Sequence, residues 1–319
     1  MHMDEISPSE LNNGRKTPGI GVRIALALII VLLLSALALY FSRFLGQDAQ
    51  YGTVLGNTTK VVEIITRMRI NLLKSTDLEK GAVMAITDEE SQALAEQSRK
   101  SADDVERDYH ELKNLIDAVK IDKEIKLLKE FSDNWDRFRL IDRELLSLAV
   151  ENTNIKAANL SYTAAAQAIA NFERLLSELM DIPTSDGERA QTAKSAYQAV
   201  TAAFMIYSLE APHINEAQDK KMDELENLMG TNEKKVRNAL SNLSRLTNQH
   251  GRIISNDALL AFSKFMEVHK EVLRLSRMNT NIKSLELSLG GKRKVAAQCE
   301  EILNSLTDTV QSRSFKATR

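Results

Sequence analysis

The stretch Glu151-Asn-Thr-Asn-Ile-Lys156 recurs as Met278-Asn-Thr-Asn-Ile-Lys283, 127 residues further along the chain (278 − 151 = 127). Matching apolar positions over more than 100 residues indicate an internal duplication. Upstream of these stretches the shift becomes 131, and a four-residue difference in one loop (131 − 127 = 4) accounts for the change. The pairs are Trp135 with Phe262, Phe138 with Phe265, Leu146 with Leu273, Leu179 with Leu306, Leu78 with Leu209, Val105 with Val236 and Leu112 with Leu243.

Each copy reads as four helices. Apolar residues step by threes, fours and sevens, as on one face of a helix, and Thr87-Asp-Glu-Glu90 has the form of a capping box. Asp181 to Gly187, with Pro183 inside it, is the clearest linker. Gly290-Gly291 interrupts the last helix. Asn152-Thr-Asn154 is expected to form a turn and N-cap, with Asn154 at the start of the fourth helix. The expected helices are 53–86, 87–119, 122–150 and 154–180 in the first copy, and 189–211, 216–248, 256–278 and 282–310 in the second.

Composition excludes several classes of function. The net charge of −2 gives no basic excess for nucleic acid. The single cysteine, Cys299, excludes an internal disulfide framework and a multi-cysteine metal site. No nucleophile-elbow, phosphate-loop or zinc-protease signature is present, and no two histidines stand four residues apart. We therefore expect neither an enzyme nor a cofactor.

Ile24 to Phe41 is apolar throughout, except for Ser35. A bilayer core needs roughly 20 such residues in a helix. Arg15, Lys16 and Arg23 precede the run, which predicts a cytoplasmic N-terminus and an exported body. The alternative is a cleaved signal peptide, because Ala36-Leu37-Ala38 has the form of a cleavage site.

The predicted fold is all-α: an N-terminal transmembrane helix followed by two tandem antiparallel four-helix bundles. The expected parts are a cytoplasmic tail at 1–22, an anchor at 23–45, bundles at 47–182 and 186–312, and a polar tail at 313–319. The anchor would place the protein in a bacterial inner membrane with its body in the periplasm. Signal cleavage would instead release that body into the periplasm.

The order of anchor, long opening helix and Trp135-bearing third helix resembles the periplasmic four-helix-bundle sensor module of bacterial methyl-accepting chemotaxis receptors. The stretch Leu145 to Ala158, which leads into the fourth helix, carries the same likeness. It covers 21–180 best, and a related receptor class carries a bimodular helical sensor of similar length. The family continues into a second membrane helix and a cytoplasmic signalling hairpin, whereas this sequence ends in a polar tail.

The resemblance implies a sensor module that dimerises, binds a small molecule outside the membrane and acts through a signalling membrane protein. The lack of the family's second membrane helix and signalling hairpin in this sequence favours a second hypothesis. In that reading the chain is a helical scaffold that docks onto an envelope assembly such as a motor, secretion or pilus machine.

A basic face on the opening helix is the candidate ligand site. Arg67, Asn71 and Lys74 stand at i, i+4 and i+7, beside Arg69, and arginine can hold a carboxylate through two hydrogen bonds. The resemblance adds Thr153 and Asn154 as partners for a small anionic ligand. A solvated surface helix is the alternative. The shift of 131 puts Gln198, Val200 and Met205 at the positions of Arg67, Arg69 and Lys74, so we expect anion binding in the first copy only.

Asp142 and His269 are repeat equivalents that fall in the apolar seam of the third helix of each copy. Polar residues in such a seam usually fix the register of a bundle.

Overall fold

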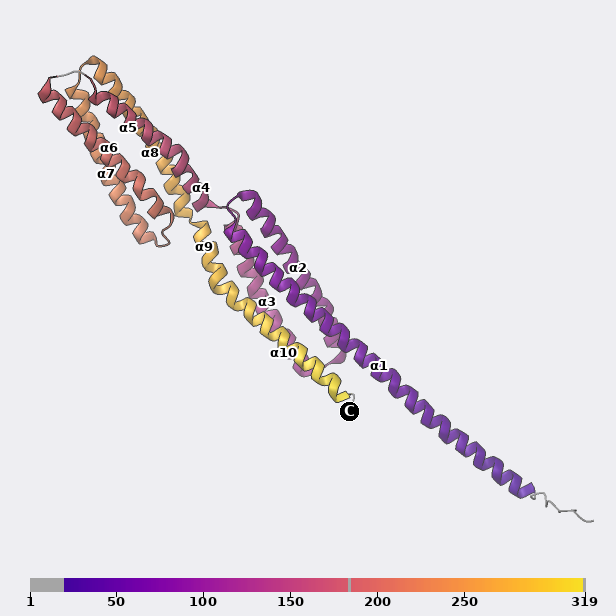
Figure 1. The fold of residues 1–319 in the computed structure, drawn as a ribbon. Coiled ribbons are helices and arrows are strands. Elements are labelled where there is room, and N and C mark those ends of the chain that lie inside the picture. The colour runs from indigo at the N-terminus through magenta and orange to yellow at the C-terminus, as the bar shows by residue number, and fades with distance from the viewer. Residues whose placement is uncertain (1–19, 183–184, 318–319) are drawn as a thin grey trace, which may run out of the picture. The chain divides into compact units, whose positions relative to one another are not determined.

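The computed structural model describes residues 20–182 and 185–317, and the surroundings of the side chains at 32, 34–40, 57–182 and 185–313 (Figure 1). The chain divides into two compact units, one of residues 61–310 and one of residues 1–60 with 311–319. Every element within the described ranges is helical, and these ranges contain no strand. The all-α prediction is therefore confirmed for this part of the chain.

The first copy begins with α1 (Ile20–Met84), and the Thr87 hydroxyl caps α2 (Asp88–Val119) by accepting from Glu90 N at 3.2 Å. Lys120, in the left-handed region at φ 59°, ends α2 before α3 (Asp122–Ala149). The fourth helix is continuous but contains one π-helical turn. Its parts are α4 (Thr153–Leu160), η1 (Ser161–Ala165) and α5 (Ala166–Met180).

The second copy repeats this order with a shorter second helix. α7 has 28 residues where α2 has 32, so the four-residue difference removes about one helical turn of 3.6 residues. The difference therefore lies within a helix, whereas the sequence predicts it in a loop. The elements are α6 (Asp186–Ile214), α7 (Asp219–Leu246), α8 (Gln249–Met278), α9 (Thr280–Leu287), η2 (Ser288–Lys292) and α10 (Arg293–Ala317).

Three sequence expectations need correction here. Gly290-Gly291 lies inside the π-turn η2 and does not break the helix. α6 continues through Pro212, which was expected to mark a connection. The proposed polar tail at 313–319 is helical as far as Ala317, and residues 318–319 lie outside the described ranges.

The first bundle consists of α1 from Val61 onward, α2, α3 and the helix α9–η2–α10. Its core holds the stacked rings of Phe131, Trp135 and Phe138, with centroids 5.9 and 4.8 Å apart. Buried residues of α10 complete this core: Val295, Cys299, Leu303, Leu306 and Val310. Burial raises the pKa of the Cys299 thiol to about 12, so it is an inert core residue.

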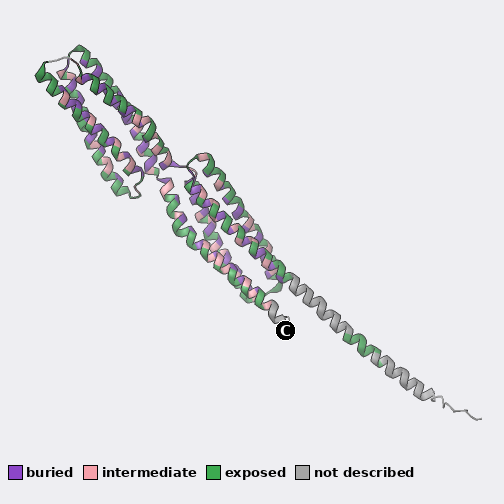
Figure 2. Cartoon of the chain, viewed as in Figure 1, coloured by how far each residue is buried: buried purple, intermediate pink, exposed green. Residues whose placement is uncertain are grey.

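The second bundle consists of α6, α7, α8 and the helix α4–η1–α5. Phe172 on α5 packs against Phe262 on α8 with ring centroids 5.5 Å apart. Small residues of α6, such as Ala196, Ala199 and Ala203, complete the core. In both bundles the buried faces of the helices point inward and the exposed faces point outward (Figure 2).

The two copies therefore exchange their fourth helices. The fourth helix of the first copy packs in the second bundle, and the fourth helix of the second copy returns to the first bundle. The contiguous bundles expected at 47–182 and 186–312 are corrected accordingly. Hydrophobic spacing shows which face of a helix is buried but not which of two similar bundles buries it.

The expected cytoplasmic tail at 1–22 falls largely outside the described residues. The expected anchor at 23–45 lies within α1, and only its side chains at 32 and 34–40 are described. Among the described residues, no helix combines the length and apolarity of a membrane span.

Candidate functional site: the crossing of the two copies

The chain passes between the bundles twice, from α3 to α4 and from α8 to α9. At each passage one asparagine adopts a left-handed conformation: Asn152 at φ 50° and Asn279 at φ 57°. Asparagine tolerates this region better than most residues. The helices α4 and α9 begin directly after these residues, which puts Asn154 and Asn281 at matching helix starts, as the repeat predicted.

The two passages bind each other reciprocally. Asn154 N donates to Asn281 Oδ1 at 3.1 Å, and Asn281 N donates to Asn154 Oδ1 at 3.2 Å. Thr153 N and Thr280 N each donate to the other threonine hydroxyl at 3.2 Å. Free N–H groups at a helix start need acceptors, and here each copy supplies them for the other. The repeated Asn-Thr-Asn sequence thus joins the two copies where they cross.

Further amide bonds fix the crossing. The Asn154 side chain donates to Ile214 O and to Asn279 Oδ1, each at 2.7 Å, and Asn281 Nδ2 donates to Asn152 Oδ1 at 3.0 Å. Except for half-buried Asn281, the asparagines and threonines of the two passages are buried. Each bond replaces one that water would otherwise make, so losing a partner strands a buried polar group.

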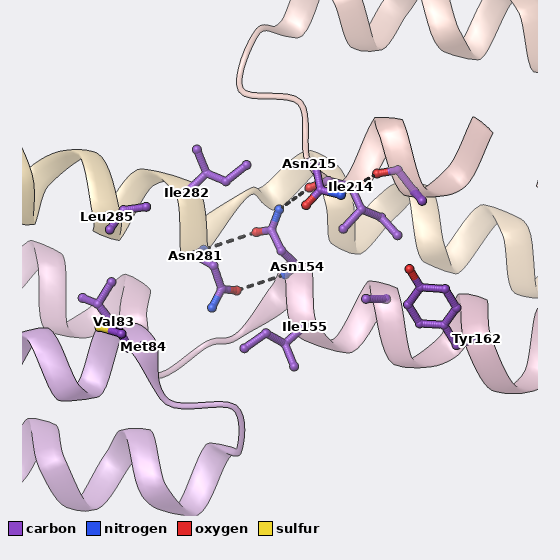
Figure 3. A pocket seen from close by; sticks show the side chains of 12 residues that line it. Val83, Met84, Asn154, Ile155, Tyr162, Ile214, Asn215, Asn281, Ile282 and Leu285 are labelled. Carbon is purple, nitrogen blue, oxygen red and sulfur yellow. Dashed lines mark hydrogen bonds between the residues drawn. The ribbon is translucent and has the colours of Figure 1, made fainter. Parts of the chain in front are cut away.

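A pocket of about 420 Å³ opens beside this crossing (Figure 3). Asn154 and Asn281 face each other on one side of it, while Tyr162 and the aliphatic side chains of both copies line the rest. The lining has no charged side chain, and its asparagine amides are already bonded within the protein. The pocket thus lies where α1, α4, α6 and α9 meet.

Each bundle contains a buried polar layer beside its π-turn. In the first bundle, Lys292 Nζ of η2 bonds to Asp142 and lies 3.3 Å from Glu79 Oε2, with all three side chains buried. The ammonium also sits 4.8 Å from the Phe138 ring centroid. Among the described atoms, Glu79 Oε1 has no hydrogen-bond partner.

The equivalent layer of the second bundle has different chemistry. Glu210 accepts from Ser161 Oγ of η1 at 2.6 Å and contacts His269 Nδ1 at 2.8 Å. Repeat shifts pair Glu79 with Glu210, Asp142 with His269 and Lys292 with Ala165. Asp142 and His269 were expected in the seam, but nothing in the sequence indicated their partners on helices from both copies.

A further cluster of polar side chains, around His213, exists only in the second copy. The buried ring of His213 lies 2.8 Å from Ser276 Oγ and 2.9 Å from Glu226 Oε1, to which Arg277 also donates. Burial lowers the pKa of His213, and the bond from Arg277 lowers the pKa of Glu226. The first copy has Ala82, Ala149, Ala95 and Val150 at these positions.

The predicted basic face is largely occupied by acidic partners. Arg67 binds Asp108 at 3.0 Å, Glu111 at 2.9 Å and Glu63 at 3.2 Å, and Arg69 pairs with Glu300 at 3.6 Å. Asn71 is half-buried and Lys74 is exposed.

The structure does not bring Thr153 and Asn154 to this face. Arg67 precedes Met84, which lines the crossing pocket with Asn154, by 17 residues (84 − 67), or about 25 Å of helix. Anion binding at Arg67 stays a prediction. Among the described residues, no group of histidine, cysteine and carboxylate side chains could hold a metal ion.

The fold is similar to that of one solved sensor domain. The structure titled as the sensor domain of the V. parahaemolyticus histidine kinase sensor TorS matches with a TM-score of 0.54 and 13% sequence identity. The match covers 80% of this chain and 99% of that one. No protein-family model and no curated protein matches the sequence. At this identity the likeness establishes a shared helical fold.

Proposed function

We propose that the chain is the extracytoplasmic sensor module of a membrane-anchored signalling receptor. The observation that carries the proposal is the path of the chain. It enters the 61–310 unit on α1 and leaves on α10, two neighbouring helices joined by the Arg69–Glu300 pair, with Val61 and Val310 in one core cluster. A change in the second bundle reaches both helices through the crossing.

The match to a histidine kinase sensor domain supports this function at the level of fold. We further propose that Ile24 to Phe41 anchors the chain, that two copies dimerise and that the module has no catalytic activity of its own. The chemotaxis-receptor type of output rests on the sequence resemblance.

A ligand screen coupled to a distance measurement tests this function. Full-length protein in detergent is screened by thermal shift against sugars, sugar acids, amino acids and dicarboxylates. Binding to the native state raises the melting temperature by mass action. Spin labels at the exposed positions Ile70 on α1 and Glu301 on α10 then report the distance between these helices.

We expect a stabilising compound to shift the Ile70–Glu301 distance. It should not shift a control pair at Ile70 and Met84, which share the single helix α1. Buried Cys299 does not interfere with labelling. If no compound raises the melting temperature, or if binding leaves both distances unchanged, sensing is rejected in favour of the scaffold hypothesis.

A further inference from the structure

A groove of about 700 Å³ runs between α6 and α7 of the second bundle. Tyr197, Thr201 and Met205 border it from α6, and Tyr197 is 64% exposed. Its walls combine one aromatic ring, a few apolar side chains, and many amide and hydroxyl groups. The lining also includes Gln198 of α6 and Asn232, Lys235, Asn238, Ala239 and Asn242 of α7.

The repeat provides an internal comparison for this groove. Its counterpart between α1 and α2 carries Arg67, which binds buried Asp108 at 3.0 Å and half-exposed Glu111 at 2.9 Å. The shift of 131 replaces these three residues with Gln198, Ala239 and Asn242. The second copy thus has no ion network here, and a hollow lies where the first copy has one.

The chemistry of the lining defines the kind of ligand. The lining contains no carboxylate, and Lys235 supplies its only positive charge, held at 3.3 Å by the Asn232 amide oxygen. The amides of Gln198 and Asn238 and the hydroxyl of Thr201 offer both donors and acceptors, as a polyhydroxylated molecule requires. The Asn232 amide is bonded to Leu228 O and Lys235, and Asn242 Oδ1 accepts from Arg245, which leaves the Asn242 Nδ2 group as a donor. The exposed Tyr197 ring offers an apolar face for a flat ring, and the ammonium can form a charge-assisted bond to a carboxylate.

We propose that this groove binds a small sugar acid, a polyhydroxylated ring with one carboxylate. The role of this site as the signal input rests on the proposed function. The binding itself is argued from the groove alone. Tyr197 stacks on the ring, the amides bond to the hydroxyls and Lys235 pairs with the carboxylate. At the basic face, by contrast, Arg67 and Arg69 are paired with carboxylates of the protein.

Calorimetric titration of full-length protein with glucuronate and glucose tests the site. We expect glucuronate to bind more tightly than glucose. Lys235→Gln should weaken glucuronate binding about tenfold and leave glucose binding unchanged. The exposed neighbour Lys234→Gln is the control and should change neither affinity. Tyr197→Ala should weaken the binding of both ligands.

A variant that fills the groove gives the sharpest comparison. The substitutions Gln198→Arg, Ala239→Asp and Asn242→Glu rebuild in the second copy the ion network of the first. We expect this variant to keep the wild-type helical content and to lose glucuronate binding. Undiminished binding in the filled variant, or no binding of either compound to wild type, would overturn the site.

The outcomes for site and function are separable. If glucuronate binds in the groove without moving Ile70 relative to Glu301, the site stands and the sensor function fails. If another compound moves these helices while no sugar acid binds, the function stands and the site fails.

Discussion

Replacing Lys292 by alanine should lower the free energy of unfolding by about 3–5 kcal/mol. The substitution leaves Asp142 and Glu79 buried without their cation, inside a core of aromatic rings. Urea unfolding followed by the fluorescence of Trp135, the single tryptophan, measures the loss in the first bundle. Lys294→Ala on the same helix is the control, since Lys294 is exposed and its removal should change stability by less than about 0.5 kcal/mol.

The same layer can be replaced as a whole. The triple variant Glu79→Leu, Asp142→Leu and Lys292→Met removes every charge together and should recover most of the stability that Lys292→Ala loses, because no buried ion is left unpaired. A loss below about 1 kcal/mol in Lys292→Ala would contradict the buried ion cluster.

Replacing Asn154 by alanine should cost about 3 kcal/mol, the second largest effect we expect. The substitution removes the partners of Asn281 N, Asn279 Oδ1 and Ile214 O at the crossing. It should also weaken the coupling of the two bundles. Trp135 fluorescence reports the first bundle and circular dichroism reports both, so the two unfolding curves should separate in the variant and coincide in wild type.

Asn159→Ala is the matched control, because Asn159 is exposed on the same helical segment. If Asn154→Ala unfolds with coincident curves and loses no more than Asn159→Ala, the crossing does not couple the bundles.

The sequence predicted the helices and the duplication better than it predicted their assembly. Periodic apolar residues and caps such as Thr87 determine where helices form, and these signals are local. The exchange of fourth helices depends on contacts between residues 127 apart, such as Asn154 and Asn281. The identical Asn-Thr-Asn sequences indicate the duplication, but their identity in both copies also fits segments that bind one another.

The buried polar layers were harder to predict. Glu79 and Lys292 look like residues of a solvated helix face, and only the π-turn and the returning helix bury Lys292 between α1 and α3. The groove at Tyr197 was not predicted, because its lining is mostly uncharged and a charged helix face is the stronger sequence signal for a ligand site. Its signal was the loss of charge at the repeat equivalents of Arg67, Asp108 and Glu111.

The exchange of the fourth helices is the central claim, and chemical crosslinking tests it most directly. The repeat shifts of 131 and 127 pair Arg69 with Val200 and Glu300 with Glu173. Four double-cysteine variants at these positions therefore cover both the exchanged and the contiguous arrangement, each with its own control. A short bismaleimide should join 69 to 300 and 173 to 200 within one chain, as the Arg69–Glu300 pair and the packing of α5 with α6 require. It should not join 69 to 173 or 200 to 300. Efficient crosslinking of the latter two pairs, with none in the former, would contradict the exchange and restore two contiguous bundles.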